Sequence, residues 1–176
     1  MTTRRTDPAK AAAAAQRDPN LIEIGIGELV VAQAPKRILT PALGSCVGVA
    51  IYDVFGRRGG LAHVMLPSPT KVSHRELVGR FAELAVPELV RMLDDEGSMR
   101  GRLQAKIAGG AAMFHGDSVG AGVGARNVAE VKRQLALMRI PLLAEDTGEA
   151  HARTVELVLE TGEFVVRSYQ FGVTRL

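Results

Sequence analysis

The chain of 176 residues contains one cysteine, Cys46, and no tryptophan. A single cysteine excludes a disulfide within the chain and any metal site built from several cysteines. Aromatic residues make up only 4% of the sequence, which argues against the stacking platforms that bind single-stranded nucleic acid. Any chemistry at Cys46 must therefore be that of a lone thiol that reacts as a thiolate.

An excess of charge of one sign is also lacking. The net charge of +3 comes from 22 basic and 19 acidic residues, and residues 1–20 carry four of the basic and two of the acidic ones. The rest of the chain is therefore nearly neutral, and a balanced surface is a poor electrostatic match for a polyphosphate. We expect no nucleic-acid partner.

No run approaches the roughly 18 apolar residues that a membrane-spanning helix needs. Arg4, Arg5 and the run Ala11–Ala15 resemble an export signal only superficially, because the alanines are few and flanked by charged residues. We expect no direct membrane insertion, and a reduced free thiol fits the cytoplasm. Residues 1–20 are expected to form a disordered, Ala-rich basic arm, followed by one domain over residues 21–176.

Short β-prone runs dominate the remaining sequence, with about eight or nine strands and two main helices expected. Two apolar runs, Val47–Tyr52 and Gly60–Leu66, bracket a polar turn that contains glycine, which predicts a β-hairpin. Clustered strands without regular βαβ alternation favour an α+β domain. In the expected architecture, layered mixed or antiparallel sheets form a sandwich that the two helices cover.

The first helix is expected to open with a capping box at Ser73–Glu76 and to stop at Gly97, with a kink at Pro87. The second is expected from Asn127 to about residue 139, after a Gly-rich loop over residues 115–126. That loop lacks the Walker lysine and the dinucleotide-binding spacing, so close packing is favoured over a phosphate site.

The hairpin brings Cys46 and His63 within reach of one another in one of two registers. If Tyr52 pairs with Gly59, then Met65 lies opposite Cys46, which shares a face with His63. Diagonal neighbours across two strands are roughly 7–8 Å apart. A slip of one residue would instead place the two side chains on opposite faces.

The other histidines are weaker candidates. His74 falls in a helix cap, His115 in a loop and His151 in a polar linker. Their spacing matches no metal-binding pattern, so we expect neither a metal nor a cofactor. Asp53 and Asp117 are interpreted as turn residues.

Six segments, read together and in order, resemble the chemoreceptor glutamine deamidases of the CheD family. They span residues 21–170, nearly the whole expected domain. The segments are Ile24–Glu28, Leu43–Val47, Gly60–Pro67, Lys106–Phe114, Gly124–Val128 and Leu143–Gly148.

The resemblance implies a catalytic site formed by Cys46, His63 and Thr40. His63 would take the proton of Cys46 to give a thiolate–imidazolium pair, and the sulfur would attack the side-chain amide of a glutamine. Backbone N–H groups near Ser45 and Cys46 would hold the oxyanion, and water would release glutamate from the thioester. Thr40 would orient the imidazole, as the third member of a catalytic triad does.

The resemblance also implies partners. The substrate would be the helical cytoplasmic tails of chemoreceptors, with a minor methyl esterase activity, and a CheC-type phosphatase would compete for the same surface. Apolar contacts could come from Val64, Met65, Leu66, Met113 and Phe114, although core packing is the favoured explanation for all five. Two alternatives remain open: a non-catalytic regulator of the phosphatase, and an amidase that acts on small molecules.

Overall fold

The computed structural model describes residues 18–69, 78–113 and 122–176, and these contain ten strands and two α-helices. The strands are β1 Leu21–Glu23, β2 Leu29–Gln33, β3 Arg37–Leu43, β4 Val47–Asp53, β5 Arg58–Val64, β6 Leu103–Gly109, β7 Leu142–Thr147, β8 Arg153–Val158, β9 Glu163–Ser168 and β10 Gly172–Arg175. The helices are α2 Ala82–Asp95 and α3 Val123–Leu137, with short 3-10 turns at Val78–Arg80 and Arg100–Arg102.

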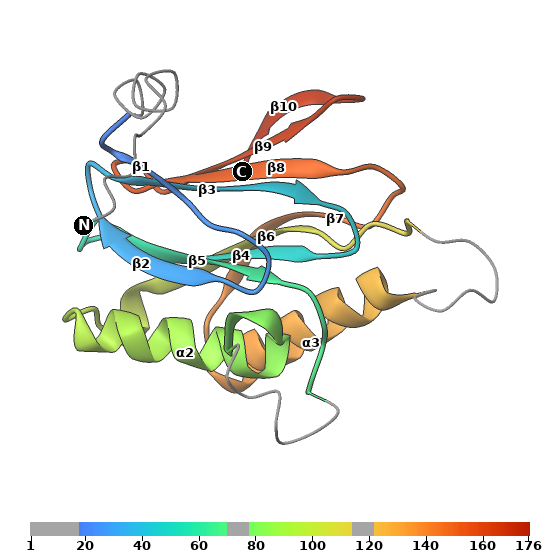
Figure 1. Ribbon diagram of the computed structural model, residues 1–176. Coiled ribbons are helices and arrows are strands. Elements are labelled where there is room, and N and C mark those ends of the chain that lie inside the picture. The colour runs from blue at the N-terminus through green and yellow to red at the C-terminus, as the bar shows by residue number, and fades with distance from the viewer. Residues whose placement is uncertain (1–17, 70–77, 114–121) are drawn as a thin grey trace, which may run out of the picture.

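The strands form two sheets of five, in the orders β1-β3-β8-β9-β10 and β2-β5-β4-β6-β7. The pairs β1/β3 and β6/β7 are parallel, whereas the other pairs are antiparallel. The two sheets stack face to face, and α2 and α3 lie against the outer face of the second sheet (Figure 1). The predicted α+β sandwich with two main helices is confirmed.

Strand β4 lies at the centre of the molecule and is buried on both faces. Val47, Val49 and Ile51 pack in the cluster between this sheet and the helices, whereas Ala50 and Tyr52 pack in the cluster between the two sheets. A strand covered on both sides reads as one continuous apolar run, which is why its sequence shows no alternation.

The end of the chain divides into more strands than expected. The predicted run of residues 163–171 stops at Ser168, and β10 begins at Gly172. The Ser168 hydroxyl accepts a hydrogen bond from the N–H of Phe171 at 2.9 Å, which closes the turn between the two strands. Turn chemistry of this kind ends a β-prone run that composition alone would continue.

The predicted helix start and capping box at residues 73–76 lie outside the described residues, and within the described part of the chain the first α-helix begins at Ala82. Its N-cap is Phe81, which offers no side-chain cap. Pro87 neither ends nor restarts the helix, which runs without interruption to Asp95. The predicted stop is confirmed, since Gly97 follows with a φ of +86°.

The second helix begins earlier than predicted, at Val123 rather than Asn127, and ends at Leu137. Residues 123–126 are therefore helical and not loop, whereas residues 114–121 lie outside the described residues. Glycine disfavours helix interiors, which is why the first turn was not predicted. Close packing requires a glycine in this turn, because a Cβ at Gly124 would lie 2.4 Å from the carbonyl oxygen of Gly110.

Residues 1–17 of the predicted arm also lie outside the described residues, so the arm stays a prediction. Asp18 is attached to the first sheet by an ion pair with Arg37 at 2.6 Å. No helix in the described part of the chain is both long and apolar enough to span a bilayer.

The cluster between the sheets should dominate stability. Leu157 of β8 is fully buried there, so Leu157→Ala should lower the free energy of unfolding by about 2–5 kcal/mol in urea titrations. Val173→Ala on the exposed strand β10, where the side chain is 58% accessible, should change it by about 0.5 kcal/mol or less. Equal effects of the two substitutions would contradict this distribution of stability.

Candidate functional site

The predicted site residues come from two strands and one turn at one end of the sandwich, where Thr40 contacts His63 and, within the described residues, Nε2 of His63 has no hydrogen bond to Cys46. Cys46 ends the turn between β3 and β4, His63 lies in β5, and Thr40 lies in β3 of the other sheet. The hairpin pairs Tyr52 with Gly59 and Gly48 with His63, which is the first of the two registers considered. Side chains alternate along a strand, so Cys46 and His63 project from the same face, toward the first sheet.

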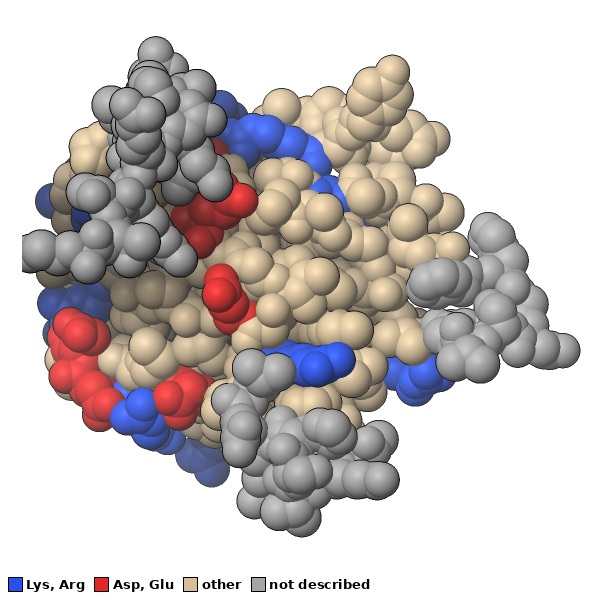
Figure 2. Space-filling view, viewed as in Figure 1, with Lys and Arg blue, Asp and Glu red and all other residues tan. Residues whose placement is uncertain are grey.

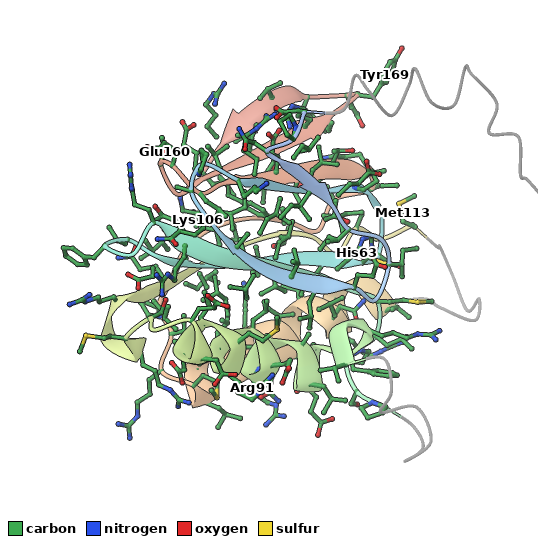
Figure 3. The ribbon with its side chains drawn as sticks, turned by 60° about the vertical axis from the view of Figure 1, so that its left-hand side comes forward. His63, Arg91, Lys106, Met113, Glu160 and Tyr169 are labelled. Atoms are coloured by element: carbon green, nitrogen blue, oxygen red, sulfur yellow. The ribbon has the colours of Figure 1, made fainter. Side chains whose placement is uncertain are left out.

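Figure 3 shows His63 at the same end of the molecule as Met113, with Lys106 and Glu160 at the other end. Strand β3 reaches this end through an irregularity between Thr40 and Leu43, where Ala42 has a φ of +59°. Pro41 lies within this irregularity and does not end the strand, because β3 continues to Leu43.

One buried hydrogen bond joins the two sheets at the site. The Thr40 hydroxyl donates to the carbonyl oxygen of Ile24 at 2.8 Å and lies 2.7 Å from Nδ1 of His63. A hydroxyl has a single proton, so its contact with His63 must be one in which Nδ1–H donates to Oγ1. The imidazole is thereby held as the tautomer whose Nε2 carries a lone pair, and Nε2 has no hydrogen-bond partner within the described residues.

Burial controls the charge of both reactive groups. His63 is 1% exposed, and burial lowers the pKa of its imidazole from 6.5 to about 4. Burial likewise raises the pKa of the Cys46 thiol. Both shifts favour the neutral forms. In the free protein, these shifts act against the expected thiolate–imidazolium pair, which stays a prediction.

The turn that carries Cys46 is fixed through its carbonyl groups. The carbonyl oxygen of Gly44 accepts from the N–H of Ala111 at 2.8 Å, and that of Cys46 accepts from Gly110 at 2.7 Å. Between them, the carbonyl oxygen of Ser45 accepts from Nδ2 of Asn127 at 2.9 Å. The N–H groups of Ser45 and Cys46 donate to no other group in the described part of the chain.

Two glycines allow this close approach. Gly109 and Gly110 have φ values of +108° and +69°, a region that side chains rarely adopt. A Cβ at Gly109 would lie 2.3 Å from the carbonyl oxygen of Cys46, and one at Gly110 would lie 2.4 Å from Val128. The sequence does not predict this requirement for glycine, since the groups that pack against Gly109 and Gly110 are distant along the chain.

Asn127 is the site residue that sequence reasoning missed. It is fully buried, and its Nδ2 also donates to the carbonyl oxygen of Met65 at 2.9 Å. It was interpreted only as the start of a helix. An asparagine at a buried position of a predicted helix is only a weak indication of such contacts, because hydrophobic periodicity does not predict which groups it would bind.

Of the other three histidines, the structure describes only His151. His151 packs against the ring of Phe171, with 4.6 Å between ring centroids, and His74 and His115 lie outside the described residues. Among the residues that the structure describes, no three potential ligands are grouped so as to hold a metal ion.

Asp53 is confirmed as a turn residue, since its carboxylate accepts hydrogen bonds from the N–H groups of Phe55 and Gly56 at 3.0 Å. Asp117 lies outside the described residues. Of the five apolar contact candidates, Val64 is fully buried, Met65 and Leu66 are half-buried, and Met113 is 43% exposed. Phe114 lies outside the described residues.

This chain is similar to known proteins over most of its length. The family model described as CheD chemotactic sensory transduction matches residues 65–168. A relative from Moorella thermoacetica, named probable chemoreceptor glutamine deamidase CheD, is 46% identical over 85% of this chain and 92% of its own length. The chemoreceptor glutamine deamidase CheD of Thermotoga maritima is 48% identical over 85% of this chain and 92% of its own.

These matches first define the chain as a protein of chemotactic sensory transduction. It belongs to the CheD family. Among solved structures, a chain titled Bacillus licheniformis hypothetical protein YfiH aligns with a TM-score of 0.49 and 14% identity over 80% of this chain and 68% of that one, too remote a likeness to support any inference.

The buried imidazole should make stability depend on pH. The folded protein keeps His63 neutral down to about pH 4, whereas the unfolded chain protonates it near 6.5. The unfolded state therefore binds the additional proton first, and the stability that neutral His63 contributes is lost as the pH falls from 6.5 toward 4. Urea titrations at pH 7 and 5 should show a larger loss for the wild type than for His63→Gln. A His63 imidazole that titrates near 6.5 by NMR would contradict the assignment.

Proposed function

We propose that this chain is a protein-glutamine deamidase that acts on the helical cytoplasmic tails of chemoreceptors, converting glutamine to glutamate with release of ammonia. The observation that carries the proposal is the hydrogen bond between Thr40 and Nδ1 of His63, at 2.7 Å. It leaves the basic Nε2 available on the face that Cys46 shares. The relatives named chemoreceptor glutamine deamidase support the choice of substrate.

The reaction begins with neutral groups. Nε2 of His63 takes the proton of the Cys46 thiol as Sγ attacks the side-chain amide carbon of the substrate glutamine. The carbonyl oxygen becomes an oxyanion, which accepts hydrogen bonds from the N–H groups of Ser45 and Cys46. The imidazolium then returns its proton to the departing nitrogen, so that the C–N bond breaks, ammonia leaves and a thioester remains.

Hydrolysis repeats these steps with water. Nε2 takes a proton from the water as its oxygen attacks the thioester, and the oxyanion again forms beside Ser45 and Cys46. The C–S bond breaks, Cys46 recovers its proton from His63, and glutamate is released. A glutamyl methyl ester would follow the same route with methanol as the leaving group, so the proposal includes a minor esterase activity.

A protein substrate needs a docking surface beside the nucleophile. Met113 is 43% exposed at this end of the molecule, and Ile26 is 62% exposed. The backbone of Ile26 is close to the site, because the N–H of the next residue, Gly27, donates to the carbonyl oxygen of His63. Figure 2 shows few charged side chains from the middle of this face toward its right-hand side, where tan marks all residues other than Lys, Arg, Asp and Glu. This uncharged surface suits an apolar stripe of a receptor helix, and a CheC-type phosphatase would compete by presenting a similar helix.

Cys46→Ala should abolish deamidation, because no other group in the site can form the thioester. The purified protein mixed with a receptor cytoplasmic fragment should produce the mass change of amide-to-acid conversion at specific glutamines, measured by peptide mass spectrometry. The variant should keep its fold and bind the fragment. Full activity in Cys46→Ala would contradict the mechanism, whereas an inactive wild type that binds the phosphatase tightly would favour the regulator.

Thr40→Val should lower kcat by about 10- to 100-fold, since loss of one buried hydrogen bond is worth roughly 1–3 kcal/mol. Valine has nearly the shape of threonine but cannot accept the proton on Nδ1. Thr40→Ser is the matched control, because it keeps the hydroxyl and should retain most of the activity. Equal kcat in the valine and serine variants would show that the hydroxyl does not orient His63.

A further inference from the structure

The side chain of Asn127 has an unusual pair of partners. Its Nδ2 lies 2.9 Å from each of two carbonyl oxygens, those of Ser45 and Met65, which come from either side of the site. A carbonyl oxygen can only accept, so the amide nitrogen, with its two protons, must face both. The side chain is fully buried, and its Oδ1 has no partner among the described residues.

The hydrogen bond to Ser45 determines more than the position of one carbonyl group. A trans peptide is planar, so the Ser45 carbonyl and the Cys46 N–H belong to one rigid unit and point in opposite directions. Fixing the carbonyl toward Asn127 therefore aims the Cys46 N–H away from α3. In the same way, the hydrogen bond from Ala111 to the Gly44 carbonyl aims the N–H of Ser45.

The second hydrogen bond fixes the strand that carries the base. Met65 lies two residues after His63, just beyond the end of β5. Its carbonyl oxygen accepts the hydrogen bond from Asn127 and takes part in no described strand pairing. One amide group thus ties the turn of Cys46 to the segment that follows His63. A buried Oδ1 without a partner among the described residues is unfavourable, and an apolar side chain at this position would avoid that cost.

We infer that Asn127 is a positioning residue for acyl transfer: by holding the Ser45 carbonyl, it prevents rotation of the Ser45–Cys46 peptide and keeps the Cys46 N–H directed at the oxyanion. Rotation of that peptide would replace the N–H by a carbonyl oxygen, which repels the developing negative charge. This inference rests on the proposed function, since it assigns Asn127 to the covalent step of that reaction.

Two reagents that attack the same sulfur separate this role from a general loosening of the fold. Acylation of Cys46 by p-nitrophenyl acetate forms an S–C bond, passes through an oxyanion and expels p-nitrophenolate. Alkylation by iodoacetamide forms an S–C bond as the C–I bond breaks, and no oxyanion appears. Both reactions pass the thiol proton to His63 or to solvent, so only the first depends on the Cys46 N–H.

In Asn127→Ala, the acylation rate should fall about 10- to 1,000-fold, the range for loss of one oxyanion-hole donor, whereas alkylation should stay within about threefold of the wild type. Gln134→Ala is the matched control, because Gln134 is a buried amide on the same helix that bonds only to Glu130 in the described structure. It should leave both rates near those of the wild type.

Each variant is measured at a temperature at which circular dichroism shows it folded. If Asn127→Ala does not fold, Asn127→Ser is measured in its place. The smaller serine side chain cannot bridge both carbonyl groups, so this variant should show the same selective loss of acylation. Unchanged acylation in the folded variant would overturn the inference. An equal fall in acylation and alkylation would also overturn it, because Asn127 would then place the sulfur and not the N–H.

The receptor assay keeps the two proposals apart. A wild type that acylates through Cys46 but never deamidates a receptor would refute the proposed substrate and leave the acylation test of Asn127 intact. On an active receptor substrate, Asn127→Ala should lower kcat with little change in KM, because Asn127 is buried and contacts no substrate. A change confined to KM would contradict the inference.

Discussion

The site depends on one buried hydrogen bond that crosses from sheet to sheet, between Thr40 of β3 and His63 of β5. Its 2.7 Å length requires the sheets to approach closely at this end, and the packing shows that they do. A Cβ at Gly48, directly opposite His63, would lie 2.9 Å from Leu43 and 3.0 Å from Val155 of the facing sheet. The close packing of the two sheets thus allows the hydrogen bond that holds the tautomer of His63.

The same burial decides how the nucleophile is activated. Removal of water disfavours both a thiolate at Cys46 and an imidazolium at His63, so burial favours the proton on sulfur in the free protein. The negative charge then appears only when a carbonyl carbon is attacked and oriented N–H groups can share it. A resting thiol of this kind is protected from oxidation, since the thiolate is the reactive form.

Around the nucleophile, the chain is held by contacts between parts distant in sequence. The Ser45 carbonyl and Asn127 are 82 residues apart in the sequence but hydrogen-bonded. Gly109 and Gly110, at the end of β6, allow the chain to pack closely against the turn that carries Cys46. Helix α3 therefore contributes to the site as well as covering the sheet. These supports explain why a turn of three small residues can present its N–H groups in a fixed direction.

The sequence by itself indicated the sandwich class and the hairpin, whereas the structure selected, from two possible registers, the one that puts Cys46 and His63 on one face. The class and the hairpin depend on local alternation and on one turn, which a period of two residues reveals. The start of α3 was predicted too late because glycine has a poor helix propensity, whereas Gly124 packs closely against Gly110 in the first turn of the helix. Only the tertiary structure decided the neutral state of His63 and the role of Asn127, since burial and contacts between distant carbonyl and amide groups leave no periodic trace in the sequence.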